Sequence, residues 1–114
     1  MKIKILVIIA LLSLGLTYAF SQEEELIKGT WIPEGCPTCQ WVFKDGKCYR
    51  YYDGELKFTY NYEIYEGKSV NGRFTFSFLK LTDTSNPNRI FEYEINALGE
   101  EKMALEYLGG TRSA

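Results

Sequence analysis

Apolar and polar residues alternate along most of this chain with a period of two. The longest alternation covers 55–64, where polar residues separate a run of apolar ones: Leu56, Phe58, Tyr60, Tyr62 and Ile64. The same pattern recurs at 91–96 and at 103–107. Successive side chains of a strand point to opposite faces, so this pattern predicts strands with one buried and one solvated face. After the charged stretch 23–25, expected to be frayed, no segment keeps a helical period for three turns.

Turn signals divide the chain into short strands. Asp45-Gly46, Asp53-Gly54 and Asn71-Gly72 are typical of tight hairpin turns, and Asn86-Pro87-Asn88 marks a later connection. Between 74 and 81 the apolar pattern slips by one residue, which indicates a bulge. Seven strands are predicted, at 27–33, 40–44, 47–52, 55–65, 73–82, 89–97 and 102–108. Short consecutive strands joined by tight turns favour an all-β fold, an antiparallel up-and-down barrel of seven strands or, with one more, eight.

Turn geometry also predicts which side chains face inward. A three-residue turn at 44–46 would place Trp41 opposite Tyr49, and a two-residue turn at 53–54 agrees with that register. The predicted inner face then carries seven aromatic residues: Trp41, Phe43, Tyr49, Tyr51, Phe58, Tyr60 and Tyr62. The same register directs two other residues outward: Cys48 and Arg50.

The first 21 residues have the three parts of an export signal. Two lysines precede the apolar run 5–16, and Ala19 and Ser21 match the −3 and −1 positions of a cleavage site. The run is shorter than the roughly 20 residues of a membrane span, and no cysteine follows it where a lipid anchor would need one. The sequence therefore predicts a signal peptide at 1–21, cleavage after Ser21, and a mature domain, 22–114, that is periplasmic or secreted.

Charge and length narrow the functional classes. Loss of Lys2 and Lys4 with the signal takes the net charge from −2 to −4, because 1–21 contains no other charged residue. Nucleic acids and anionic membranes require a basic patch, so neither is an expected partner, and no membrane insertion is expected after cleavage. A chain this short forms one domain with a modest core, to which its aromatic residues (Tyr 9, Phe 7, Trp 2) contribute much of the buried area.

Several short motifs resemble the small lipocalin-like domains of secreted bacterial proteins. Gly29-Thr30-Trp31 resembles the G-x-W signature at the start of the first lipocalin strand. The stretches 79–83, 93–98 and 103–107 are similar to later strands of those domains. The resemblance implies a calycin-type β-barrel in which Trp31 plugs the closed end.

The resemblance also implies a late arginine stacked on that tryptophan, for which Arg112 is the candidate beside Arg89. Two features depart from the pattern. No helix is found to pack beside the barrel, and small relatives carry one more strand after the region that matches 109–112. Either one barrel edge is open, which is a pairing hazard, or a neighbouring molecule covers it. The oligomeric state stays open.

The predicted aromatic face has two interpretations. A barrel of about eight strands is just wide enough to be filled by its own side chains or to hold one small ligand. The resemblance implies a small apolar ligand in the lumen or mouth, and the hydroxyl groups of the tyrosines favour a partly hydrated mouth. We therefore expect binding of a small hydrophobic or amphipathic ligand by the seven aromatic residues above. The alternative is a protein-interaction or inhibitor module that uses a free barrel edge and loops.

The three cysteines favour a structural disulfide in an oxidising compartment. The spacing Cys36-Pro37-Thr38-Cys39 also occurs in redox motifs, but here no βαβ pattern surrounds it. Cys36–Cys39 is the predicted pair, with Cys36–Cys48 as the alternative.

Catalytic machinery is not apparent. The chain has no histidine, so a Ser-His or Cys-His pair is excluded, and three thiols without histidine make a poor zinc site. Acidic residues such as Glu92 and Glu94 alternate with apolar ones and are interpreted as solvated strand faces. We expect neither enzymatic activity nor a cofactor.

Overall fold

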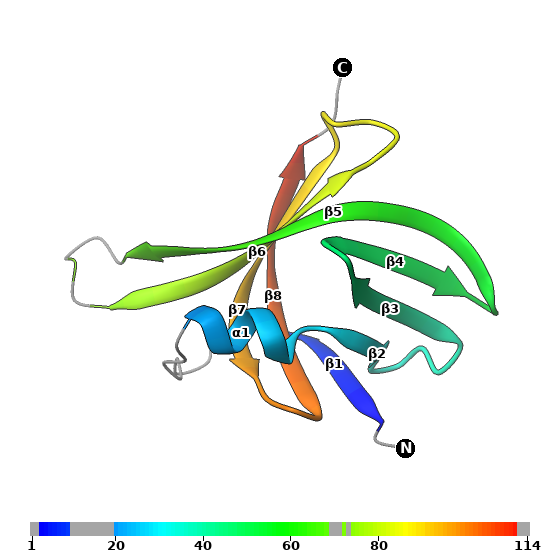
Figure 1. Cartoon of the computed structure of the whole chain (residues 1–114), viewed down its shortest axis with the longest axis horizontal. Coiled ribbons are helices and arrows are strands. Elements are labelled where there is room, and N and C mark those ends of the chain that lie inside the picture. The colour runs from blue at the N-terminus through cyan, green and yellow to red at the C-terminus, as the bar shows by residue number, and fades with distance from the viewer. Residues whose placement is uncertain (1–2, 10–19, 69–71, 73, 112–114) are drawn as a thin grey trace.

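The computed structural model describes residues 3–9, 20–68, 72 and 74–111. These residues form a closed barrel of eight strands and one short helix (Figure 1). The elements are β1 (Lys4–Ile9), α1 (Phe20–Leu26), β2 (Gly29–Pro33), β3 (Cys39–Lys44), β4 (Lys47–Tyr52), β5 (Glu55–Lys68), β6 (Thr75–Asp83), β7 (Ile90–Leu98) and β8 (Lys102–Thr111). The predicted all-β barrel is confirmed, and its closure is compatible with a calycin-like fold.

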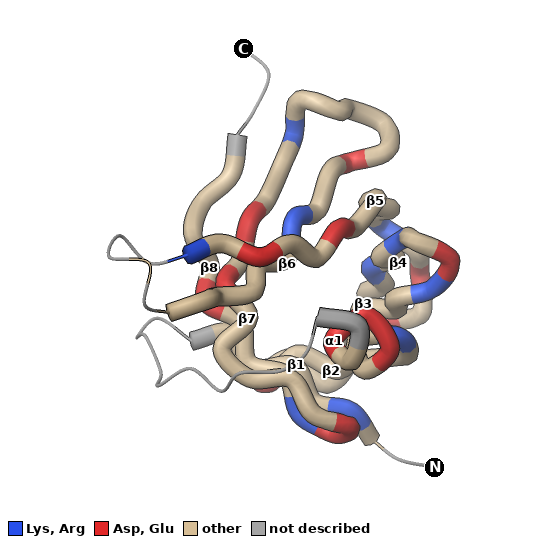
Figure 2. The backbone as a smooth tube through the Cα atoms, turned by 60° about the vertical axis from the view of Figure 1, so that its left-hand side comes forward, with Lys and Arg blue, Asp and Glu red and all other residues tan. Residues whose placement is uncertain are grey.

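Strands β2 to β8 follow one another as an antiparallel meander, and they correspond to the seven predicted strands within a few residues. Strand β1 differs, because it lies between β2 and β8 and runs parallel to both. It belongs to the segment predicted as an export signal, whose removal stays a prediction. Figure 2 shows the strands as a ring, with acidic and basic residues interspersed around it.

The two Asp-Gly turns at 45–46 and 53–54 set the shape of β3 to β5. All four of their residues have positive φ, between 50° and 79°, as a type I′ turn requires. Lys44 pairs with Lys47 across the first turn, which therefore has two residues and not three. The turn predicted at 53–54 is confirmed, and the three-residue turn predicted at 44–46 is wrong.

The bulge predicted between 74 and 81 is also wrong, because β6 pairs with both neighbours without a shift in register. The apolar pattern slips there because Phe76 and Phe78 lie on the face of β6 opposite to the buried Leu79 and Leu81. Phe78 stacks on Tyr65 of β5, with ring centroids 5.2 Å apart. The irregularities lie elsewhere, between Arg50 and Tyr51 in β4 and at two points of β7.

Helix α1 covers residues that were expected to be frayed. Glu23, in its first turn, is buried and accepts a 2.6 Å hydrogen bond from the Ser77 hydroxyl of β6. Burial raises the pKa of Glu23, and the Ser77 hydrogen bond opposes that rise. Acidic residues in the first turn also favour a helix through its dipole. Ile27, the first residue after the helix, is fully buried and anchors the end of α1 in the core.

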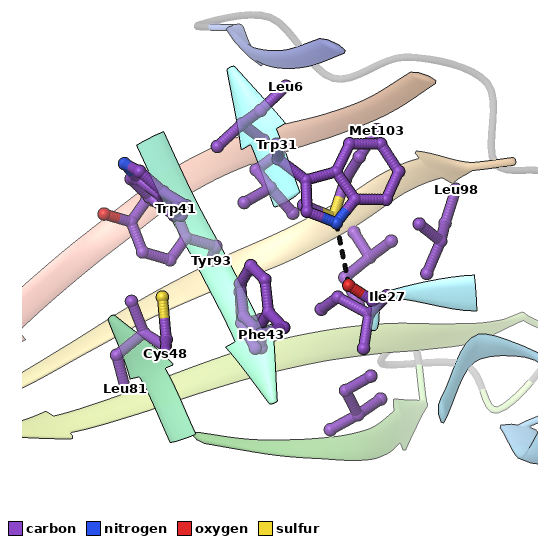
Figure 3. Close-up of a cluster of buried hydrophobic side chains, with 14 of the residues drawn as sticks. Leu6, Ile27, Trp31, Trp41, Phe43, Cys48, Leu81, Tyr93, Leu98 and Met103 are labelled. Atoms are coloured by element: carbon purple, nitrogen blue, oxygen red, sulfur yellow. Dashed lines mark hydrogen bonds between the residues drawn. The ribbon is translucent and has the colours of Figure 1, made fainter. Parts of the chain in front are cut away.

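The core fills the barrel between these elements (Figure 3). Its fully buried side chains include Trp31, Phe43, Tyr60, Leu6, Ile27, Leu79, Leu81, Leu98, Met103 and Leu105. The indole of Trp31 donates a 2.7 Å hydrogen bond to the carbonyl of Ile27, drawn as the dashed line in Figure 3. This bond joins the end of α1 to β2.

Candidate functional site

The predicted aromatic face is only partly assembled in the structure. Trp41, Phe43 and Tyr60 are buried inside the barrel. Tyr49 and Tyr51 are not on that face, because their register partners on β3 are Val42 and Gln40 rather than Trp41. Directly paired residues share a face.

The register predicted for β3, β4 and β5 is wrong at two points. The turn at 45–46 is one residue shorter than predicted, so Trp41 faces Arg50 and Phe43 faces Cys48. A bulge between Arg50 and Tyr51 then shifts the pairing with β5. Cys48 and Arg50, predicted to point outward, therefore lie on the inner face. Leu56, predicted to face inward, is 50% exposed.

Arg50 occupies the middle of the barrel interior. Its guanidinium lies 3.8 Å from the centre of the Trp41 ring and 4.9 Å from that of Tyr60, which are cation–π distances. Its Nη2 donates a 3.2 Å hydrogen bond to the hydroxyl of Tyr93. Burial raises the pKa of Tyr93, and the charge of Arg50 opposes this rise. Here the barrel is filled by its own side chains.

Cys48 lies beside this cluster and is fully buried. Burial raises the pKa of its thiol to about 12, although Arg50 acts in the opposite direction. Because the thiolate is the reactive form, Cys48 is an inert core residue. The predicted disulfide is present and joins Cys36, in the loop before β3, to Cys39, the first residue of β3, with the Cα atoms 5.4 Å apart.

A second arginine covers the rim of the barrel near the loop between β6 and β7. The guanidinium of Arg89 lies 5.3 Å from the ring centres of both Phe58 and Phe91. It also pairs with Asp83 at 3.7 Å. Burial would raise the pKa of Asp83, but hydrogen bonds from Ser85 and the charge of Arg89 outweigh it, so the pKa is lowered. Phe58, a predicted ligand residue, thus packs under a guanidinium.

The end of the barrel near α1 has a cleft of about 390 Å³. Its aromatic floor consists of Phe43 and Tyr62, whose rings meet edge to face at 5.1 Å. Seven residues line it: Glu24, Lys28, Phe43, Lys44, Asp45, Gly46 and Tyr62. The charged ones form a rim that carries both signs. This cleft therefore combines an apolar floor with polar groups at its edge.

Local structure holds the cleft together. The amide of Tyr62 donates a 3.1 Å hydrogen bond to the carbonyl of Gly46, which ties β5 to the turn at the rim. Burial raises the pKa of the Tyr62 hydroxyl, and the nearby charge of Glu24 adds to the rise. Two of the seven predicted ligand residues, Phe43 and Tyr62, line this cleft. The contribution of α1 to the cleft was not predicted. The available signal was the apolar pair Leu26-Ile27 directly after three glutamates, because such a pair can pack against the barrel at the end of a short helix.

Two other hollows lie on the described surface. One, of about 310 Å³, is lined by Ile90, Glu92, Leu108, Gly109 and Gly110. The other, of about 260 Å³, is lined by residues of β1 and of the loop after β2, among them Ile5 and Pro37. Neither contains any of the predicted ligand residues.

Trp31 has a cationic neighbour, but it is not the predicted one. Lys4 of β1 places its ammonium 5.0 Å from the centre of the Trp31 ring and donates a 2.6 Å hydrogen bond to the carbonyl of Lys28. The predicted partner, Arg112, lies outside the described residues.

No protein-family model, no curated protein and no solved structure matches this chain significantly. Among the described residues, no helix is long and apolar enough to cross a membrane. Within the same ranges, no three metal-ligating side chains are grouped closely enough to hold an ion. The fold and the cleft are therefore the observations on which a function must be argued.

Proposed function

We propose that this protein is an exported, non-enzymatic, lipocalin-like domain that binds a small amphipathic ligand in the cleft beside α1. The observation that supports it is the cleft itself, with Phe43 and Tyr62 as its floor and charges of both signs at its rim. A volume of about 390 Å³ falls in the range of small-molecule sites, which are mostly apolar with a few placed polar groups.

The filled interior restricts the ligand. Arg50, Trp41 and Tyr93 occupy the middle of the barrel, so a long acyl chain has no open lumen to enter. A compact ring or short chain with a polar head fits the cleft better. Lys28 and Lys44 are the candidate partners for an acidic head, and Glu24 and Asp45 for a basic one.

Two further observations are consistent with the other parts of the proposal. The antiparallel meander of β2 to β8 and the buried Trp31 of the G-T-W stretch are consistent with a lipocalin-like domain. The Cys36–Cys39 disulfide agrees with an oxidising compartment, as export requires.

The test uses protein purified from the exported fraction and the fluorescent probe anilinonaphthalene sulfonate, which has an apolar ring system and an acidic head. We expect saturable binding that Tyr62→Ala weakens by roughly tenfold or more, because it removes the aromatic floor. Lys28→Ala, a change of an exposed rim residue, should weaken binding by severalfold without affecting folding.

Tyr49→Ala is the matched control, since it removes the same side chain from the outer face of the neighbouring strand. It should leave the affinity unchanged. Equal binding by the Tyr62→Ala, Lys28→Ala and Tyr49→Ala variants, or no saturable binding at all, would contradict the proposed site. Circular dichroism on each variant verifies that the barrel is folded.

A second candidate function is protein binding at a barrel edge. The observation that favours it is the pairing of β1, because the strand that closes the barrel comes from the predicted signal. If that segment is removed, β2 and β8 become edge strands.

A further inference from the structure

Strand β1 fits between β2 and β8 as an inserted strand. Its residues 4–6 pair with 31–33 of β2, and its residues 5–9 pair with 102–106 of β8, in parallel on both sides. The amide of Ile5 donates to the carbonyl of Glu101, and the amide of Glu34 donates to the carbonyl of Leu6, each at 2.8 Å. We call the space that residues 4–9 fill the β2/β8 slot.

Two side chains of β1 are recognised by the slot. Leu6 is fully buried in the core and pairs with Met103 of β8 (Figure 3). Lys4 lies over the Trp31 ring and bonds to the carbonyl of Lys28. The slot therefore accepts a cation and, two residues later, a large aliphatic side chain.

The outward side chains of β1 are poorly covered. Ile3, just before the strand, is 65% exposed, and Ile5 is 42% exposed. A permanent outer strand of a barrel usually carries polar residues on its solvent face. Exposed isoleucines are expected in an export signal, because its apolar run must enter the membrane. They are not expected on the solvent face of a strand that stays in the barrel.

Removal of residues 1–21 would leave the slot empty. Adjacent strands lie about 4.8 Å apart, so β2 and β8 would flank a gap of roughly 10 Å, with unpaired backbone groups on both sides. Exposed strand edges bind extended segments by adding a strand. The edge carries more acidic than basic residues. Glu34 follows β2, Glu101 precedes β8 and Glu106 lies within it, whereas Lys102, the partner of Ile5, is the basic residue of this stretch.

We propose that the processed protein binds an extended, cationic–apolar segment of a partner protein in the β2/β8 slot, parallel to β2 and β8. The segment carries Lys or Arg at the place of Lys4 and a large aliphatic residue at the place of Leu6. This inference rests on the export and cleavage in the proposed function and is independent of the cleft beside α1. The acidic edge and the net charge of −4 after loss of Lys2 and Lys4 favour a basic segment over a second copy of this acidic chain.

The experiment begins with the full-length chain in a bacterial host that exports it. Intact mass of the exported protein shows whether residues 1–21 have been removed. A fluorescein-labelled peptide with the sequence of residues 2–9 is then titrated into the purified protein, and fluorescence anisotropy measures its binding. Hydrogen exchange reports the amides of Glu34 and of 102–106, with and without the peptide.

Three peptide variants locate the contact without changing the protein. Leu6→Asp should weaken binding by roughly tenfold or more, because it removes the buried side chain. Lys4→Ala should weaken it by about two- to fivefold, as expected for one cation–π contact. Ile5→Asp is the matched control, since Ile5 faces outward, and it should have little effect.

The outcomes separate this proposal from the one on which it rests. A mass that retains residues 1–21 overturns export and the slot together. A processed protein that does not bind the peptide, or that binds the Leu6→Asp and Ile5→Asp peptides equally, overturns the slot alone. Protection of the Glu34 and 102–106 amides before peptide is added also overturns it, because either a second copy or direct pairing of β2 with β8 has then filled the gap.

Discussion

Strand β1, whose pairing with β2 and β8 we call the β1 seam, and the β5–β8 part of the meander both contain many large apolar residues. They differ in how completely these side chains are buried. Among the described side chains of strand β1, Leu6 is fully buried, and Ile5 and Ile8 are exposed. Strand β7, in contrast, buries nearly all of 93–98, with β6 on one side and β8 on the other. In β6 the alternate residues Leu79 and Leu81 are both fully buried.

The difference indicates that the strand that closes the barrel is not the part that stabilises it. The meander is antiparallel and its strands are joined by short connections, so each pair forms with little loss of chain entropy. Strand β1 joins by parallel pairing across a long connection and contributes few core contacts. We therefore expect the meander to persist when the seam is altered.

The largest expected effect distinguishes two fully buried leucines, Leu81 of β6 and Leu6 of β1. Leu81→Ala should lower the free energy of unfolding of the exported protein by about 2–5 kcal/mol, because it leaves a cavity in the meander core. Leu6→Ala, introduced into the precursor, should leave the exported protein unchanged, because cleavage removes that residue. Urea unfolding measures both. A destabilised Leu6→Ala protein would show that β1 is retained.

Next in size is the difference in local opening between the two regions. In the processed protein without a partner, the amides of 102–106 should exchange at least roughly tenfold faster than those of 77–82 in β6, which are paired with β5 on one side and β7 on the other. Hydrogen exchange with mass spectrometry measures this ratio. Equal protection in β6 and β8 would mean that the free edge of β8 is covered in the processed protein, and the comparison would fail.

The smallest effect is on pH dependence. Burial raises the pKa of both Glu23 and Glu94, and for Glu94 the neighbouring charge of Glu106 adds to the rise. A carboxyl whose folded pKa is raised disfavours the folded state once it ionises. The contribution of these two carboxyls to the free energy of unfolding should therefore be greatest below about pH 4.5, the ordinary pKa of glutamate. It should fall as the pH rises through their folded pKa values.

Glu23→Gln should flatten that fall, since the amide oxygen can still accept the Ser77 hydrogen bond. Glu94→Gln should flatten it less in the processed protein, because Glu94 lies beside β8, where the seam opens. Thermal unfolding between pH 4 and 7 tests this order. Glu55→Gln, an exposed glutamate paired with Lys57, is the control and should not change the slope. An identical slope in all three variants would contradict the assignment.

The candidate site was less accessible to sequence reasoning than the fold. Phe43 and Tyr62 were predicted to face the ligand, and they line the cleft beside α1. The rim residues Glu24 and Lys28 were not predicted, because their position depends on how a seven-residue helix docks on the barrel. Helices this short have little intrinsic stability, so packing against the barrel decides whether they form.

The seven strands β2 to β8 and their order were determined by the sequence alone. Side-chain alternation and the φ angles of Asp-Gly turns are properties of neighbouring residues, and they are legible without knowledge of the rest of the fold. Only the tertiary structure decided that Arg50 and Cys48 face inward, because a turn one residue shorter reverses the faces of a strand. It also decided which segment closes the barrel, since pairing between residues 4–9 and 102–106 joins distant parts of the chain and leaves no local pattern.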